Sequence, residues 1–283
     1  MTMRKSVNET IWRVVTYILL FLILGLMFFP VYWMLVTSFK IAGEVYQIPP
    51  RWLPSTWTIQ NYVKLFSGYV PFPLYLRNSI IACLVTSLLA TAGATLAAYA
   101  LSRLRFPAKR TYLLAILATQ MFPHVLLLLS LYVTYRELKL YDTLTGLIIA
   151  FTTFAIPFSV WMMKGFFDSV PVEIEEAALI DGCTRMQALR IVVLPSVVPG
   201  LLAVGLFSFL EAWNNLLYPL TLATSNEVRT LPPGLLLSFL GQFKQDWGGM
   251  MAASVVVTIP TTIVFIFLQR YLIQGLTAGA VKG

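Results

Sequence analysis

Long apolar runs alternate with shorter polar segments along this chain, and this pattern predicts helices that cross a membrane. About 20 consecutive apolar residues are enough for a helix to span the hydrocarbon core of a bilayer. The pattern predicts such helices at about Val14–Val36, Asn78–Leu101, Tyr112–Tyr135, Thr143–Met163, Ser196–Tyr218 and Met250–Gln269. We therefore expect an all-α polytopic membrane protein with six transmembrane helices.

Proline and small residues add detail to this pattern. Pro123 falls inside the third predicted helix and is expected to kink it, because proline removes a backbone donor. Gly93 and Ala97 are spaced for close packing of the second helix against a neighbour. The segments Lys40–Leu76 and Leu222–Gly249 are interrupted by prolines, so we expect them to be loops outside the membrane.

Composition and charge support a membrane protein and exclude most soluble classes. Hydrophobic residues make up 58% and charged residues 11% of the 283 residues. In soluble domains about half of the residues are apolar and about a quarter are charged. The net charge is +8, but the basic residues lie mostly between apolar runs, where they set topology. Membrane lipid is therefore an expected partner, and nucleic acid is not.

Basic clusters predict which side of the membrane each segment faces. Arg4, Lys5 and Arg13 precede the first helix. A second cluster follows the second helix and consists of Arg103, Arg105, Lys109 and Arg110. Because positively charged residues are retained in the cytoplasm, both termini are predicted to be cytoplasmic. Residues 1–13 would form the N-terminus, 14–270 a single transmembrane domain and 271–283 a tail.

A polar, amphipathic stretch covering residues 170–199 separates the fourth and fifth predicted helices. Pro171 suits the first turn of a helix, and the carboxylates that follow favour the positive end of the helix dipole. Gly182 is expected to end this helix because glycine accepts a left-handed conformation. Thr184 with Gln187 predicts a capping box that starts another helix. The stretch should therefore fold as helix, bend and helix.

The same stretch carries a narrow apolar face and a spaced motif. Ile174, Ala177 and Ala178 share one face, and the two alanines let another backbone come close. The stretch resembles the EAA loop of permease subunits of binding-protein-dependent ABC importers, through Glu176-Ala177-Ala178, Gly182 and Leu194-Pro195. Val192 stands where that pattern has isoleucine, which removes one methylene.

This resemblance implies a type I ABC importer permease fold with a coupling loop at 166–195 that sits in a cleft of a cytoplasmic ATPase subunit. The docking residues that it implies are Glu176, Ala177, Ala178, Asp181 and Gly182. The implied partners are a second homologous permease subunit, two ATPase subunits that bind ATP and Mg²⁺, and an extracytoplasmic solute-binding protein. The chain itself would hold no cofactor or metal, catalyse no reaction, and lie in the cytoplasmic (inner) membrane of a bacterium or archaeon.

Nearly the whole chain is similar to the maltose-type permease subunits of carbohydrate importers. The similar pieces are A-A-Y-A-L-S-R-L-R-F-P, W-M-M-K-G-F-F-D-S-V-P, A-W-N-N and the ending G-L-T-A-G-A-V-K-G. Their order and spacing imply translocation of a sugar or oligosaccharide by alternating access. The same importer class also carries non-sugar and phosphorylated solutes, and this alternative stays open.

Polar residues in the fifth predicted helix are candidates for lining a translocation path. They recur at steps of three and four, as Ser208, Glu211, Asn215 and Tyr218. A carboxylate in a membrane span is either functional or satisfied by an interhelical hydrogen bond, and both interpretations of Glu211 stay open. The full set of candidates is Gln120, Glu211, Asn214, Asn215 and Tyr218.

Two other functional classes are poorly supported by the residues present. A proton-coupled secondary transporter would use Glu211, but such carriers have inverted repeats and more helices. A membrane-embedded enzyme would find only His124, expected to be a hydrogen-bonded bundle residue, and two separated cysteines, Cys83 and Cys183. The sequence also lacks the G-x-x-x-x-G-K-[ST] phosphate loop, so ATP hydrolysis is assigned to a separate subunit.

Overall fold

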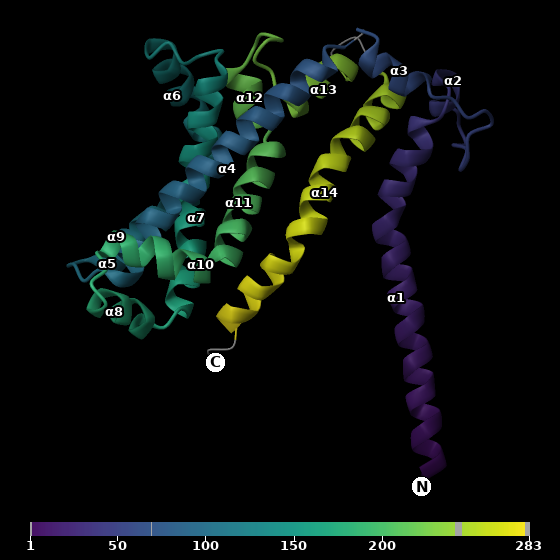
Figure 1. Cartoon of the computed structure of the whole chain (residues 1–283). Coiled ribbons are helices and arrows are strands. Elements are labelled where there is room, and N and C mark those ends of the chain that lie inside the picture. The colour runs from purple at the N-terminus through teal and green to yellow at the C-terminus, as the bar shows by residue number, and fades with distance from the viewer. Residues whose placement is uncertain (1, 69, 241–244, 281–283) are drawn as a thin grey trace. The chain divides into compact units, whose positions relative to one another are not determined.

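The computed structural model describes residues 2–68, 70–240 and 245–280, and within these ranges the chain forms helices and connections but no strand (Figure 1). The helices are α1 (Thr2–Ser38), α2 (Ala42–Val45), α3 (Gln60–Phe66), α4 (Phe72–Arg103), α5 (Lys109–Ala118), the 3-10 turn η1 (Thr119–Met121), α6 (His124–Glu137), α7 (Leu144–Ser169), α8 (Val172–Ile180), α9 (Arg185–Ala188), the π turn η2 (Leu189–Val193), α10 (Leu194–Ser196), α11 (Val198–Trp213), α12 (Leu217–Leu222), α13 (Leu231–Phe239) and α14 (Trp247–Ala280).

Among the described residues, 4 helices are long and apolar enough to cross a membrane, and two bent helix pairs raise the number of spans to 6. The continuous segments are Trp12–Ser38, Phe72–Arg103, Leu144–Ser169 and Trp247–Phe267. The pairs are Lys109–Met121 with His124–Glu137, bent by 92°, and Arg185–Ser196 with Val198–Trp213, bent by 79°. The predicted all-α membrane fold with six spanning segments is confirmed, with two of the segments broken.

The third span is broken rather than kinked. The helical turns before the break end at Met121, and α6 starts at His124. Phe122 is extended, with φ −79° and ψ 129°, because the ring of Pro123 disfavours a helical backbone in the residue before it. The prediction of one kinked helix over Tyr112–Tyr135 is therefore wrong at this point.

The fifth predicted helix is also interrupted. α11 ends at Trp213, and the chain becomes helical again only at Leu217. The side chain of Asn215 causes the second start, because its Oδ1 accepts a hydrogen bond from the backbone N–H of Tyr218 at 3.1 Å, a local bond that competes with a continuous helix. The predicted polar stripe therefore crosses a break.

Other boundaries differ by about one or two turns. α4 starts at Phe72 rather than near Asn78, because Pro73 is tolerated in a first turn. α7 continues to Ser169, and α13 occupies part of the predicted second loop. α14 continues to Ala280, so most of the predicted tail is helical, while residues 281–283 lie outside the described residues.

Three helices form the core of a compact unit made of residues 71–235 and 257–283. α4, α7 and α11 pack against one another, with Ala94 and Ala98 of α4 fully buried. The predicted Gly93 and Ala97 lie one position away and are partly buried: Ala97 packs against the same core cluster, and a Cβ atom added at Gly93 would lie 3.8 Å from Ile156 of α7. Within this unit α8 and α9 lie near the end of α4, whereas α12 packs against α6 and α7 on the opposite side of the unit (Figure 1).

The other compact unit consists of residues 1–70 and 236–256 and has a polar interior. Lys40 is buried, donates a hydrogen bond to the carbonyl of Arg51 at 2.6 Å and lies 4.4 Å from the ring centre of Trp33. Burial lowers the pKa of Lys40, and the Glu44 carboxylate opposes this effect. Glu44 in turn accepts from the backbone N–H of Ser55 at 2.8 Å. The predicted outer loop is therefore a folded segment.

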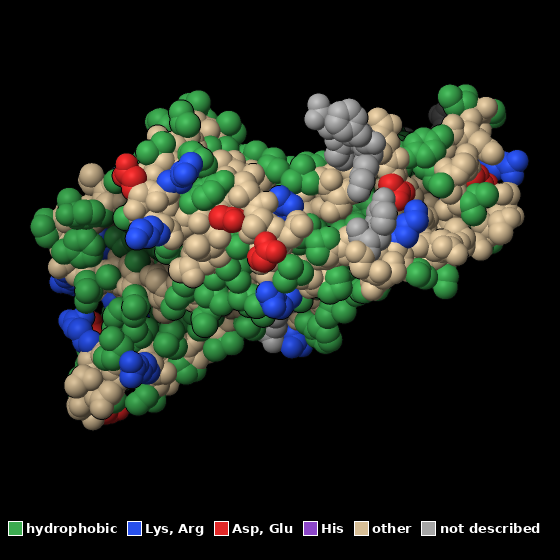
Figure 2. Space-filling model, turned by 90° about the horizontal axis from the view of Figure 1, so that it is seen from above, with side chains coloured by type: hydrophobic (Ala, Val, Ile, Leu, Met, Phe, Trp, Pro, Cys, Tyr) green, Lys and Arg blue, Asp and Glu red, His purple; other side chains and the backbone are tan. Residues whose placement is uncertain are grey.

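Apolar side chains cover much of the surface, with charged side chains scattered among them (Figure 2). On α1 the largest apolar side chains are open to the surroundings, for example Phe21 at 78% and Leu26 at 76% exposure. Exposed apolar surface of this extent is unfavourable in water and favourable in hydrocarbon. The surface therefore suits a helix in lipid.

Candidate functional site

The polar stretch folds as predicted into a helix that ends at a glycine. Gly182 follows α8 with φ +89°. The N–H of Cys183 donates to the carbonyl of Ala178 at 3.0 Å, and the N–H of Gly182 donates to that of Leu179 at 3.2 Å. These two bonds define a Schellman motif, in which glycine takes the left-handed position without strain. The bend therefore depends on Gly182.

The predicted capping box starts the next helix. The N–H of Thr184 donates to Gln187 Oε1 at 2.7 Å, and the N–H of Gln187 donates to Thr184 Oγ1 at 3.3 Å. The helix then widens into the π turn η2 shortly before Pro195, which has no N–H to donate. Leu189 and Val193 of this turn are buried in the cluster formed by α4, α7 and α11. The second half of the loop is therefore anchored in the hydrophobic cluster between these helices.

A buried ion pair fastens α8 to the end of α4. Arg103 Nε lies 3.0 Å from Glu175 Oε2, and both side chains are only 4% exposed. The hydroxyl of Tyr99 donates to Glu175 Oε1 at 2.5 Å. Arg103 Nη2 also donates to the carbonyl of Val170 at 2.7 Å, just before α8 begins. The position of α8 is therefore fixed by three contacts with the last turn of α4.

The predicted docking residues do not all face outward. Glu176, Ala177, Asp181 and Gly182 are exposed, and a Cβ atom added at Gly182 would have no heavy atom within 4 Å. Ala178 is only 8% exposed and packs inside the chain. Four of the five residues thus form a surface that a partner could contact, and their docking role remains a prediction.

Sequence reasoning missed the two residues that hold this surface in place. In the sequence, Glu175 is one of the carboxylates that follow Pro171 and favour the start of a helix, and Arg103 is one of the basic residues that predict topology. Neither residue belongs to the spaced motif. The only local signal is the position of Arg103 in the last turn of α4, where a cation is favoured by the helix dipole.

A polar pocket of about 640 Å³ lies between α8 and the segment that follows α4. Its lining contains three arginines and two glutamates among apolar residues: Arg103, Leu104, Arg105, Phe106, Val172, Glu175, Glu176, Leu179 and Arg185. Arg103 and Glu175 are paired with each other, and the other three charged lining residues, Arg105, Glu176 and Arg185, are exposed. The surface around α8 therefore combines an acidic residue, Glu176, with basic neighbours.

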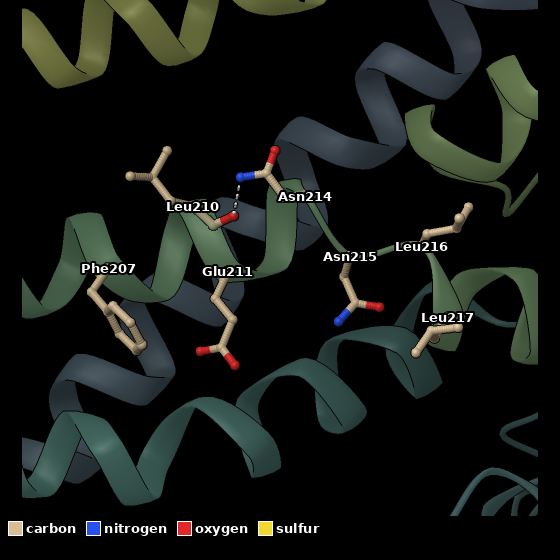
Figure 3. A pocket seen from close by; sticks show the side chains of 7 residues that line it. All are labelled: Phe207, Leu210, Glu211, Asn214, Asn215, Leu216 and Leu217. Atoms are coloured by element: carbon tan, nitrogen blue, oxygen red, sulfur yellow. Dashed lines mark hydrogen bonds between the residues drawn. The ribbon is translucent and has the colours of Figure 1, made fainter. Parts of the chain in front are cut away.

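A second pocket, of about 580 Å³, lies at the end of α11 (Figure 3). It is lined by Phe207, Leu210, Glu211, Asn214, Asn215, Leu216 and Leu217. Glu211 Oε2 is buried and has no hydrogen-bond partner among the described residues. Asn214 turns back and donates to the carbonyl of Leu210 at 2.9 Å. The structure thus brings together Glu211, Asn214 and Asn215.

Gln120 and Tyr218, the other two predicted path residues, do not line that pocket. Tyr218 is buried and stacks on Phe154 with ring centres 4.6 Å apart. Gln120 donates to the carbonyl of Phe154 at 2.9 Å. The ring centre of His124 lies 4.9 Å from that of Phe154, with the two rings tilted by 37°. No hydrogen bond of His124 is found among the described residues, so it packs against aromatic rings instead of being the expected hydrogen-bonded residue. These residues join α6, α7 and α12.

The described residues offer little for metal or thiol chemistry. They include no group of three His, Cys, Asp or Glu side chains that could hold a metal ion. Cys83 is buried in α4, and the partly exposed Cys183 follows α8; both are free thiols.

Comparisons with known proteins agree with this arrangement. Over 281 residues the chain is 37% identical to the diacetylchitobiose uptake system permease protein DasC of Streptomyces coelicolor, covering 99% of this chain and 100% of the relative. It is 35% identical to the trehalose/maltose transport system permease protein MalG of Thermococcus litoralis, with the same coverage of 99% and 100%. A solved bacterial ABC transporter chain, involved in import of the acidic polysaccharide alginate, matches with a TM-score of 0.81 at 22% identity, covering 93% of this chain and 97% of that one.

The structural match shows that the chain shares the fold of that transporter chain. A family model described as binding-protein-dependent transport system inner membrane component matches residues 90–278, which include α8, the glycine bend, the capping box and the pocket at the end of α11. The chain therefore belongs to the family of inner-membrane components of binding-protein-dependent transport systems.

Proposed function

We propose that this chain is one of two permease subunits in an ATP-driven importer that moves a sugar or oligosaccharide across the membrane by alternating access. The observation that carries this proposal is the EAA loop as a folded unit. Its exposed surface, formed by Glu176, Ala177, Asp181 and Gly182, is fastened from behind by the buried pair of Arg103 and Glu175. Such a unit is suited to receiving a movement from outside the chain.

The contacts of α8 indicate how this movement would be passed on. A push or pull on α8 reaches α4 through Glu175 and Arg103, because a buried charged pair does not separate without a large cost. The π turn η2 carries the same displacement into the core through Leu189 and Val193. Since α4, α7 and α11 are packed together, the three helices would tilt as one body and open the path to alternate sides.

The cargo is proposed to be a saccharide for two reasons. The relatives named above are permeases for diacetylchitobiose and for trehalose or maltose. The pocket at the end of α11 combines apolar walls with amide and carboxylate groups, a composition that is usual for small-molecule sites and offers partners to sugar hydroxyls. A phosphorylated or non-sugar solute is the alternative result of the test below.

The proposal includes partners and an orientation. The importer would contain a second homologous permease, two cytoplasmic ATPase subunits that bind ATP and Mg²⁺, and an extracytoplasmic solute-binding protein. A structure related to this fold, at 16% identity, is of an alginate transporter in complex with a periplasmic protein. Both termini and α8 would face the cytoplasm, as the basic residues around Arg103 and Lys109 favour.

Reconstitution of the complete importer tests this function. The purified complex with its ATPase and binding protein in lipid would be assayed for ATP hydrolysis and uptake across neutral, acidic and phosphorylated saccharides. Stimulation by at least one saccharide class is expected. An assembled complex that hydrolyses ATP but responds to none of them would refute the saccharide assignment, and uptake driven by a proton gradient without ATP would refute the importer class.

A further inference from the structure

The pocket at the end of α11 contains one acidic group and no basic group. Its lining includes Glu211 but no lysine or arginine. Among the described residues, the ion pairs involve Glu44, Asp168, Glu175 and Asp246, and none involves Glu211. A single carboxylate with low-dielectric walls therefore dominates the potential that a solute meets in this pocket.

The polar groups of the pocket are oriented by local bonds. Figure 3 shows that the side chains of Glu211 and Asn215 extend to the same side of the chain, whereas Asn214 turns back toward Leu210. Because Asn215 Oδ1 accepts from the N–H of Tyr218, the amide nitrogen of Asn215 points toward the Glu211 side as a donor. The unpartnered Glu211 Oε2 is an acceptor beside it.

This arrangement of groups distinguishes neutral from acidic solutes. A sugar hydroxyl is both a donor and an acceptor, so neighbouring hydroxyls satisfy the Glu211 carboxylate and the Asn215 amide together. Phe207, which Figure 3 shows on the same side as Glu211, offers apolar surface to the carbon face of a sugar ring. The carboxylate of a uronate or the phosphate of a sugar phosphate finds no cation in the pocket lining and is repelled by Glu211.

We propose that Glu211 is a selectivity residue, which admits neutral saccharides to this pocket and excludes acidic ones. The inference rests on the proposed saccharide cargo and narrows it. The binding protein would choose the cargo before delivery, and Glu211 would apply a second, electrostatic selection within the membrane.

A cysteine in the pocket measures this potential without relying on the binding protein. In the complete importer, Cys183→Ser removes the partly exposed native thiol, and Leu217→Cys places a new one in the pocket lining, on the side to which Glu211 and Asn215 extend (Figure 3). Modification by cationic and anionic methanethiosulfonates of similar size is then timed. We expect the cationic reagent to react at least about tenfold faster, because a nearby carboxylate attracts one reagent and repels the other.

Two further variants decide whether Glu211 is the cause. Adding Glu211→Gln, which keeps the size and removes the charge, should bring the ratio of the two rates close to one. Adding Glu227→Gln is the matched control, because Glu227 is an exposed carboxylate outside the pocket lining, and the ratio should stay unchanged. If the Leu217→Cys variant does not assemble, Phe207→Cys offers a second position in the same lining.

The inference is wrong if the two reagents react equally in the parent, if Glu211→Gln leaves the ratio unchanged, or if neither cysteine position reacts from water. A neutral saccharide should slow the modification and a uronate should not; protection by both would also overturn the inference. If the rates behave as expected but the importer takes up no saccharide, the proposed cargo fails while the exclusion of anions by Glu211 stands.

Discussion

Replacing Glu175 by Gln is expected to destabilise the protein by about 3–5 kcal/mol, because it leaves the Arg103 guanidinium buried without its counter-charge. The size of the effect follows from burial: both side chains are 4% exposed and the charged atoms lie 3.0 Å apart, so water solvates a lone guanidinium there much less well than bulk water does. Glutamine retains an oxygen that can accept the hydrogen bond from the Tyr99 hydroxyl. The loss of stability therefore measures mainly the loss of the negative charge.

A double-mutant cycle separates the ion pair from the other contacts of these residues. Arg103→Met should cost about 4–6 kcal/mol, since it also removes the bond to the carbonyl of Val170, which contributes about 1 kcal/mol. The variant carrying both changes should lose less than the sum by at least about 2 kcal/mol, because neither charge is then left alone.

Thermal and denaturant unfolding of the subunit in lipid or mild detergent would measure these values. A loss of 3 kcal/mol corresponds to a Tm lower by about 6 °C or more in a protein of this size. The matched control is Asp168→Asn, which breaks the pair with Lys164 on the same side of the molecule; those side chains are 44% and 22% exposed, so the cost should stay near 1 kcal/mol or less. A cost below about 1 kcal/mol for Glu175→Gln, or strict additivity in the cycle, would refute the reasoning.

Three shorter predictions concern the loop, the orientation and the core. Gly182→Leu should reduce coupled ATP hydrolysis and uptake with normal assembly, since a left-handed leucine costs about 1–2 kcal/mol and projects from an exposed bend; parent-like coupling would contradict the proposed docking surface. Native Cys183 should react with an impermeant maleimide in inverted vesicles but not in intact spheroplasts, with buried Cys83 silent in both; the opposite pattern would reverse the topology. Gly200→Val should lower Tm by several degrees, because a Cβ there would lie 2.4 Å from the ring of Phe166; an unchanged Tm would show that the ring moves aside freely.

Local sequence signals predicted the features that depend on neighbouring residues. The spanning segments follow from the length of apolar runs, and the helix, bend and helix of the loop follow from Gly182, Thr184 and Gln187. Each of these signals acts within a few residues through backbone conformation or a short hydrogen bond, so tertiary packing had little opportunity to change the result.

The sequence predicted less well where a helix breaks. A proline in an apolar run is compatible with a kinked helix or with a complete break. The structure has a break before Pro123, because the backbone of Phe122 is extended. The prediction of a polar stripe that ends at Tyr218 assumes one continuous helix. In the structure the side chain of Asn215 accepts a hydrogen bond from the N–H of Tyr218, and a new helix starts there. The predicted path residues were therefore divided, with Glu211, Asn214 and Asn215 at the pocket and Gln120 and Tyr218 around Phe154.

The sequence by itself determined that this is a helical membrane protein with an EAA-type loop. Apolar runs, helix caps and the loop motif each depend on residues that are close to one another along the chain. Only the tertiary structure decided that Glu175 meets Arg103, that Ala178 faces inward and that Glu211 has no basic neighbour in its pocket. These contacts join residues from different helices, and their partners depend on how α4, α7, α8 and α11 rotate and pack, which no local pattern specifies.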